Sequence, residues 1–114
     1  MVTPFAVTRR HEGEGVSRLV LTGDLDEDTS KSLIGLIIDI AEQEDVSEIV
    51  VDVRRVRLLA AAGVRALLRG REAAAEMGRR FRVVNATGIV YQVLRISGVH
   101  KTLAVTVESD VAAR

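Results

Sequence analysis

The chain has 114 residues, 47% of them apolar, so it is long enough for one modest hydrophobic core and predicts a single domain over residues 1–114. It contains no cysteine, which excludes disulfides and thiolate metal sites and fits the reducing cytoplasm. The formal net charge is zero, so no overall basic field favours nucleic acid, although residues 1–48 hold 4 basic and 11 acidic side chains and residues 49–114 hold 12 basic and 5 acidic ones.

Hydrophobic periodicity in the first half of the chain predicts a strand, a helix and a second strand. Residues 17–23 alternate and stop at a glycine, which indicates a strand that ends in a turn. Residues 26–44 begin with acids and hydroxyls and then continue as an amphipathic helix. Its apolar face comprises Leu33, Leu36, Ile37, Ile40 and Ala41. Residues 47–53 are β-branched and almost continuously apolar, which favours a buried parallel strand.

In the second half, three alanines lead into two more helical patterns and two more strand patterns. The first helical face ends at Gly78 and comprises Val64, Leu67, Leu68 and Ala75. Residues 79–85 alternate as a strand. Residues 86–98 predict a third helix whose face comprises Ile89, Val90, Val93 and Ile96, and residues 102–109 predict a final short strand. With one further strand near the start, this order predicts an α/β fold with right-handed crossovers.

No pattern typical of an enzyme or of a metal site is present in the sequence. His11 and His100 lie far apart, no serine stands in a G-x-S-x-G elbow, and no glycine-rich stretch ends in Gly-Lys-Ser/Thr. We therefore expect no catalytic residue, no cofactor and no metal. The amino terminus lacks a secretory signal pattern and no apolar run could span a bilayer, so we expect a soluble protein with no direct membrane insertion.

The acidic stretch around residues 24–28 has two interpretations. Its carboxylates could serve glycosidase-like or metal chemistry. Acids at a helix start also favour the positive end of the helix dipole, and Asp28 or Thr29 is expected to cap the first helix. We favour capping and turn chemistry, because it explains every acid without a further partner.

Four stretches together resemble a known family: residues 21–33, 48–68, 78–99 and 101–103. In their order and spacing they resemble the STAS domain, especially the single-domain bacterial anti-sigma factor antagonists, from about Ser17 to Thr106. The resemblance implies a mixed, mostly parallel sheet of four to five strands with three to four helices. It also implies a non-catalytic module that binds a protein partner.

The chain departs from the family pattern at the start of the second helix. Asp52, Val56, the Leu58–Leu59 pair and Gly63 match the family motif, but its Asp-Ser-Ser/Thr is replaced by alanines at positions 60, 61 and 62. In anti-sigma factor antagonists one of these hydroxyls is phosphorylated by a partner kinase, which is itself the anti-sigma factor, and the phosphate abolishes their association. Because Ala61 and Ala62 cannot accept phosphate, the resemblance implies a constitutive or differently regulated binder.

Replacing a capping hydroxyl or carboxylate with alanine costs a helix about 1 kcal/mol, so something must offset the loss. Three explanations stay open: burial of the corner against a partner, water on the free amides, or an anion bound near the arginines at positions 54, 55, 57, 65 and 69. Arg65 and Arg69 share a helix face, which predicts an acidic partner surface or an ion pair with Glu72. The predicted partner-binding residues are Asp24, Asp26, Leu58, Leu59, Ala60, Ala61, Ala62, Gly63, Arg65 and Arg69.

Three functions remain open at this stage. The first is a regulatory module whose partner is an anti-sigma factor with a kinase-like fold. The second is a scaffold or accessory subunit of a transporter or signalling complex. The third is a nucleotide-binding protein, which the missing phosphate-loop motif disfavours. A second apolar edge on the first helix, at Ile34 and Ile38, also leaves self-association into a homo-oligomer open.

Overall fold

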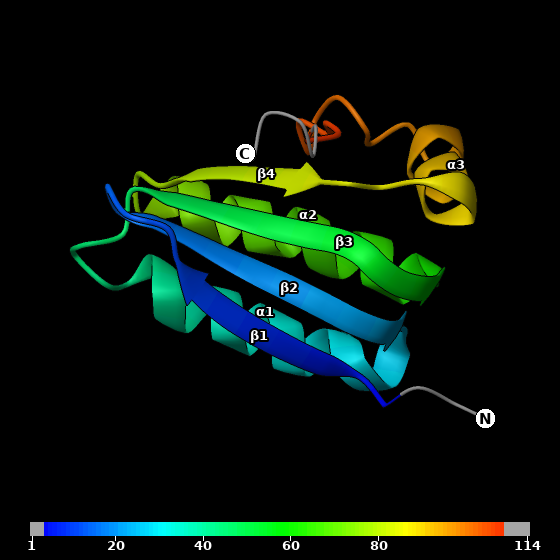
Figure 1. Cartoon of the computed structure of the whole chain (residues 1–114), viewed down its shortest axis with the longest axis horizontal. Helices are drawn as coiled ribbons and strands as arrows, with labels where there is room; N and C mark the ends of the chain where they lie inside the picture. Colours follow the sequence, from blue (N-terminus) through cyan, green and yellow to red (C-terminus); the bar gives the residue numbers. More distant parts are fainter. Residues whose placement is uncertain (1–3, 109–114) are drawn as a thin grey trace.

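The structure, a computed structural model, describes residues 4–108. This part of the chain forms four strands and three helices: β1 (Ala6–His11), β2 (Val16–Leu25), α1 (Glu27–Ala41), β3 (Glu48–Leu59), α2 (Ala61–Glu76), β4 (Arg80–Val84) and α3 (Gly88–Ile96). The strands form one sheet in the order β1-β2-β3-β4, antiparallel between β1 and β2 and parallel elsewhere (Figure 1). The predicted α/β class, with its mostly parallel mixed sheet and its additional early strand, is confirmed.

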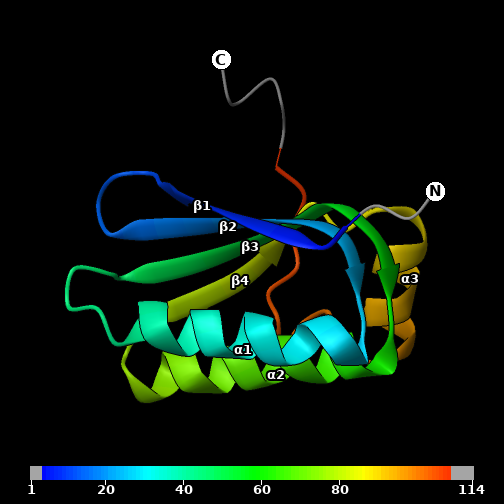
Figure 2. The ribbon, with the colours of Figure 1, turned by 90° about the horizontal axis from the view of Figure 1, so that it is seen from below.

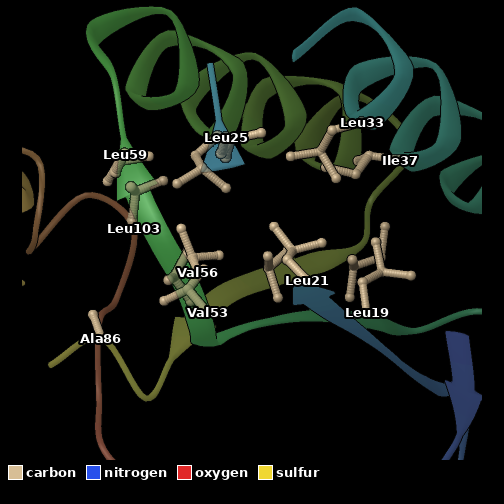
Figure 3. Close-up of a cluster of buried hydrophobic side chains, with 14 of the residues drawn as sticks. Leu19, Leu21, Leu25, Leu33, Ile37, Val53, Val56, Leu59, Ala86 and Leu103 are labelled. Carbon is tan, nitrogen blue, oxygen red and sulfur yellow. The ribbon is translucent and has the colours of Figure 1, made fainter. Parts of the chain in front are cut away.

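One face of the sheet is covered by α1 and α2, which run side by side beneath it, while α3 lies beyond one end of the sheet (Figure 2). Because side chains alternate along a strand, Leu19 and Leu21 of β2 point toward these helices, and both are fully buried. They pack with Leu33 and Ile37 of α1 in the main apolar cluster (Figure 3). The main core therefore lies between the sheet and the helix layer, and both contribute side chains to it.

The second half of β3 departs from simple alternation. Its pairing with β2 shifts register twice, between Val20 and Thr22 and between Gly23 and Asp24. Each shift inserts one extra residue into β3, so that Val53, Val56 and Leu59 are buried at three-residue intervals. The strand therefore runs six residues beyond the predicted end at Val53, and it presents two exposed residues between successive buried ones.

The opposite face of the sheet holds a buried arginine among carboxylates. Arg18 of β2 is only 9% exposed. Its guanidinium donates to Glu12 Oε2 at 2.8 Å, to Asp52 Oδ2 at 3.0 Å and to Glu108 Oε2 at 2.6 Å. Asn85 completes the group, because its amide donates to Asp52 Oδ2 and its oxygen accepts from the Glu108 backbone N–H. These contacts join β2, β3 and the segment after α3 across the face that the helices leave uncovered.

The strand predicted over residues 102–109 is wrong for residues 102–108, the part of it that the structure describes. Residues 99–104 form turns, with the Leu103 N–H donating to the Val99 carbonyl at 2.9 Å, and these turns bring Leu103 fully into the core. The segment after α3 pairs with the sheet through one isolated parallel bridge, Thr106 to Val84, and the Leu103 carbonyl accepts from the Val83 N–H. Ser109 lies outside the described residues.

The buried faces of α2 and α3 differ in part from those predicted. In α3, Val90 and Leu94 are buried, whereas Ile89 is 66% and Ile96 is 86% exposed. The two isoleucines lie about 130° around the helix from the buried pair, so a short helix that packs on one side cannot bury both sets. In α2, Ala74 is buried in place of the predicted Ala75, which is exposed.

We predict that Glu108→Gln destabilises the fold in a pH-dependent way. The hydrogen bond from Arg18 lowers the pKa of Glu108 below its usual value, despite partial burial that opposes the shift. A carboxyl group with a lowered folded-state pKa stabilises the fold above its unfolded pKa, and this contribution is lost as the pH falls through the lowered value. The variant should therefore lose about 1 kcal/mol of unfolding free energy at pH 7, a value discounted for the partial exposure of Glu108.

Urea unfolding at several pH values measures this effect, with Glu44→Gln at an exposed position as the matched control. The difference between wild type and Glu108→Gln should begin to shrink as the pH falls below about 4.3, the usual pKa of a glutamate in an unfolded chain, and should be lost once the pH is below the lowered pKa of folded Glu108. A difference that stays constant with pH would contradict an electrostatic role for this contact.

Candidate functional site

The predicted binding residues gather where β3 ends and α2 begins, and we call residues 58–65 the β3–α2 corner. The pairing of β2 with β3 places Asp24 opposite Leu58 and Leu25 opposite Leu59. The Ala60 N–H then donates to the Leu25 carbonyl at 3.0 Å, which joins the first residue of the corner loop to the end of β2. Asp24, one of the predicted binding residues, thus lies beside the corner.

The corner depends on Gly63, in the first turn of α2. A Cβ at this position would lie 2.6 Å from the Leu25 carbonyl oxygen and 2.8 Å from Leu59 Cδ1. The first of these neighbours is backbone, which cannot rotate away. Gly63 therefore allows α2 to approach the end of β2 closely, which a side chain would prevent.

The two helices of the covering layer begin in opposite ways. In α1 the Asp26 side chain accepts hydrogen bonds from the Asp28 and Thr29 backbone N–H groups, and Thr29 Oγ1 accepts from the Asp26 N–H in return. The cap is therefore Asp26, two residues before Asp28 and three before Thr29, the caps that were predicted, and the capping interpretation of the acidic stretch is supported. The Asp26 side chain is therefore engaged in capping α1.

In α2 the equivalent position is Ala60, whose extended backbone has the usual N-cap geometry but whose side chain makes no cap bond. No acidic residue stands in the first turn. The amides at the start of α2 are therefore left without a side-chain acceptor, and the helix presents a bare positive dipole end.

The corner is apolar where it meets solvent. Leu58 is 49% exposed, Ala61 is exposed, and Ala60 and Ala62 are half-buried. Leu59 is instead buried in the core cluster, and the structure places Gly63 beneath the surface as well. Leu59 and Gly63 were predicted to bind a partner, but both are buried, so they support the structure of the corner and are not accessible to a partner.

Arginines surround this apolar surface. Arg55, between the two register shifts of β3, and Arg57 beside Leu58 are exposed. The Arg65 side chain, on the first turns of α2, makes no ion pair or hydrogen bond with any residue of the described range. Arg69 instead forms an ion pair with Glu72 at 3.6 Å, which was one of the two predicted alternatives. Both side chains are well exposed. Arg69 thus belongs to the outer side of the helix layer, away from the corner.

Sequence reasoning missed the buried network around Arg18. Its signal was a single arginine inside the alternating apolar stretch of residues 17–23, which is unusual because a buried charge must be paired. The strand-end aspartate of the motif, Asp52, acts in this network: one carboxylate oxygen accepts from Arg18 and the other from the Arg54 backbone N–H at 3.0 Å. Asp52 therefore stabilises β3 at the first register shift, where β3 contains one extra residue.

Within residues 4–108, no three His, Asp or Glu side chains are grouped so that they could hold a metal ion. Among the helices of the same residues, none is long and apolar enough to cross a membrane. The chemistry that the corner offers is therefore that of a contact surface: an exposed leucine, small alanines, free helix amides and cationic side chains.

Comparison with known proteins identifies this arrangement. A family model described as "Mlab, STAS domain" matches residues 8–107. A search of curated proteins gives no match.

Solved structures with similar folds include two regulatory proteins. An anti-sigma factor antagonist from Mycobacterium paratuberculosis is 21% identical with a TM-score of 0.83, over 99% of this chain and 96% of that one. The anti-sigma factor antagonist SpoIIAA in its unphosphorylated form is 18% identical with a TM-score of 0.80, over 95% and 92%. A sulfate transporter family protein from Wolinella succinogenes is 23% identical with a TM-score of 0.70, over 81% and 76%. The fold is thus shared by regulators and by a transporter family.

We predict that Gly63→Ala destabilises the protein by about 2–4 kcal/mol, because the new methyl group would overlap a backbone oxygen that only a shift of α2 can relieve. Gly35→Ala on α1 is the matched control, since no atom lies within 4 Å of its added Cβ. The control should be stabilised by up to about 1 kcal/mol through helix propensity. Urea unfolding measures both changes, and equal stability of the two variants would contradict the close approach.

We also predict that Ala60→Ser stabilises the protein by about 1 kcal/mol. Its backbone already has the extended N-cap conformation, so a hydroxyl there can accept from the free amides of the first turn. Ala61→Ser, inside the helix, should change the unfolding free energy by no more than about 0.5 kcal/mol. Thermal unfolding of the two variants measures the difference, and no gain for Ala60→Ser would mean that the free amides are already satisfied.

Proposed function

Because this chain belongs to the STAS domain family, we propose that it is a non-catalytic regulatory module that binds a protein partner through the β3–α2 corner. The observation that carries the proposal is the half-exposed Leu58 beside the exposed Ala61 at an uncapped helix start. An apolar residue ringed by cationic side chains is typical of the centre and rim of a protein interface. A partner would cover the leucine and supply acceptors to the free amides of α2.

The partner that we propose is an anti-sigma factor with a kinase-like fold. Two solved structures with this fold are anti-sigma factor antagonists, and one of them, SpoIIAA, is described in its unphosphorylated form. Arg55, Arg57 and Arg65 favour an acidic surface on that partner. The cysteine-free sequence supports a reducing compartment, the cytoplasm.

We further propose that this binding is not switched by phosphorylation of the corner. A phosphate on a hydroxyl in the first turn of α2 would add about two negative charges to the contact surface. Ala61 and Ala62 have no hydroxyl, so this route of release is absent, and binding is constitutive or controlled in another way. The competing function is that of a scaffold, in which the same corner would bind a subunit of a transporter or signalling complex.

We predict that Leu58→Glu abolishes partner binding. The full chain is used as immobilised bait in the native cytosol, and retained proteins are identified by mass spectrometry. Wild type should retain an anti-sigma factor with a kinase-like ATP-binding domain, and Leu58→Glu should retain at least about tenfold less, because a charge would be buried in the apolar centre of the contact. Ile96→Glu is the matched control, since Ile96 is an exposed apolar residue on α3.

Two further results decide between the functions. An Ala61→Ser/Ala62→Ser variant should be phosphorylated and released when ATP is added, while wild type keeps its partner and gains no phosphate by intact-mass analysis. Retention of transporter subunits, or of the chain alone, would contradict the anti-sigma proposal and favour the scaffold. Equal retention by Leu58→Glu and Ile96→Glu would remove the corner from the interface.

A further inference from the structure

A second surface lies at the other end of α2 from the corner. A groove of about 360 Å³ runs between the C-terminal half of α2 and the start of β4. We call it the basic groove, because four arginines line it: Arg71, Arg79, Arg80 and Arg82. On α2 the groove residues Arg71 and Ala75 follow Arg65, the last residue of the β3–α2 corner, by six and ten residues, which is about 9–15 Å along the helix. Figure 1 shows α2 and β4, the two elements between which the groove lies.

The positive charge of the basic groove is only partly balanced. Among residues 4–108, Glu48 is the one acid in its lining, and it is shared by Arg82 at 3.2 Å and Arg80 at 3.9 Å. Arg79 donates to the Ala41 and Gln43 carbonyls, which offer partial charges but no carboxylate. Arg71 is exposed and meets no acid among residues 4–108. The groove therefore has a surplus of guanidinium groups, with Arg71 and the mostly exposed Arg80 the most accessible.

The groove also contains an open strand edge. β4 is the last strand of the sheet, and its Val83 N–H and C=O face outward, where they bond to Leu103 and Thr106. The Arg80 N–H faces the other way and donates to Ser47 beside β3. Along a strand, the backbone N–H and C=O of successive residues point alternately to the two edges of the strand. Phe81 is two residues before Val83, so its N–H and C=O face outward as those of Val83 do. Within residues 4–108 no backbone group bonds to them on that side, and the groove lies there instead.

We propose that the basic groove binds an extended acidic peptide segment of a partner protein, which adds to the edge of β4 at Phe81. One peptide residue would exchange both backbone hydrogen bonds with Phe81. Its neighbours on either side would point to the face of Arg80 and Arg82, where acidic side chains would meet the guanidinium groups. Ala75, Phe81 and Ala104 provide an apolar floor for the residue between them.

A bare anion fits this groove less well than a peptide does. The Phe81 carbonyl oxygen faces the same open edge as its N–H, and it would repel a phosphate while leaving its own lone pairs unpaired. An extended peptide satisfies both groups. The chain already uses the adjoining edge in this manner, since the segment around Thr106 pairs in parallel with Val84. The open edge is short, so ion pairs contribute much of the affinity and salt should weaken it.

This inference does not depend on the proposed function, and one titration tests it. The probe is a fluorescein-labelled peptide with the core Glu-Val-Glu-Val-Glu, followed by fluorescence anisotropy at about 20 mM and about 200 mM NaCl. We expect saturable binding that weakens with salt, that falls about tenfold in Arg71→Glu/Arg80→Glu, and that persists with a smaller loss in Arg71→Gln. Hydrogen exchange of the Phe81 amide, followed by NMR, should slow when the peptide is bound.

The matched control is Arg10→Glu/Arg95→Glu, which makes the same change in net charge at exposed positions on β1 and α3. This control should keep its affinity within about twofold, and so should Leu58→Glu at the β3–α2 corner. Equal loss in both double variants, binding of a matching lysine peptide, or an unchanged Phe81 amide would overturn the proposal. Displacement of the peptide by an equal concentration of inorganic phosphate would also overturn it, in favour of a simple anion site.

Discussion

The pairing of β2 with β3 is the constraint on which the rest of the structure depends. Two extra residues in β3 change its burial from every second to every third residue, so the strand keeps Val53, Val56 and Leu59 in the core while it bends toward α2. Without the bend, the end of β3 could not deliver Ala60 to the Leu25 carbonyl. The same geometry exposes two residues in every three, which places Arg55, Arg57 and Leu58 on the surface.

The two faces of the sheet are stabilised by different physics. On the helix side, burial of leucine, isoleucine and valine side chains supplies the driving force, and Gly63 and Gly70 allow α2 to approach its neighbours closely. On the other side, a single guanidinium meets three carboxylates, so that removing one partner leaves a nearly buried charge less compensated. The raised pKa of Arg18 has the same cause, because the hydrogen bonds that it donates to Glu108 and Glu12 outweigh desolvation. This network ties the end of the described chain to the sheet.

Sequence periodicity predicted the class and order of the elements because most of them bury one regular face. It failed where tertiary contacts change the period. The extension of β3 beyond Val53 depends on the partner strand, and a lone chain segment does not reveal a bulge. Ile89 and Ile96 look like core residues, but the face of α3 that packs is decided by Val90 and Leu94. At the candidate site, the motif predicted a strand-to-helix junction at positions 59–63, which the structure has, and the site itself stays a prediction. The burial of Leu59 and Gly63 and the grouping of arginines from α2 and β4 required the fold.

The contrast between the two helix starts bears on how the proposed binding is controlled. α1 satisfies its first amides within the chain through Asp26, so it has no need of an external acceptor. α2 leaves its first amides to solvent or to a partner, and any acceptor on that partner would gain from the dipole end and from the adjacent Arg65. A hydroxyl at position 61 would add a group that a kinase can charge, whereas alanine leaves that position uncharged under all conditions. Affinity at the proposed site would then depend on the partner's own state and concentration, or on a change elsewhere in this chain, but not on phosphorylation of the corner.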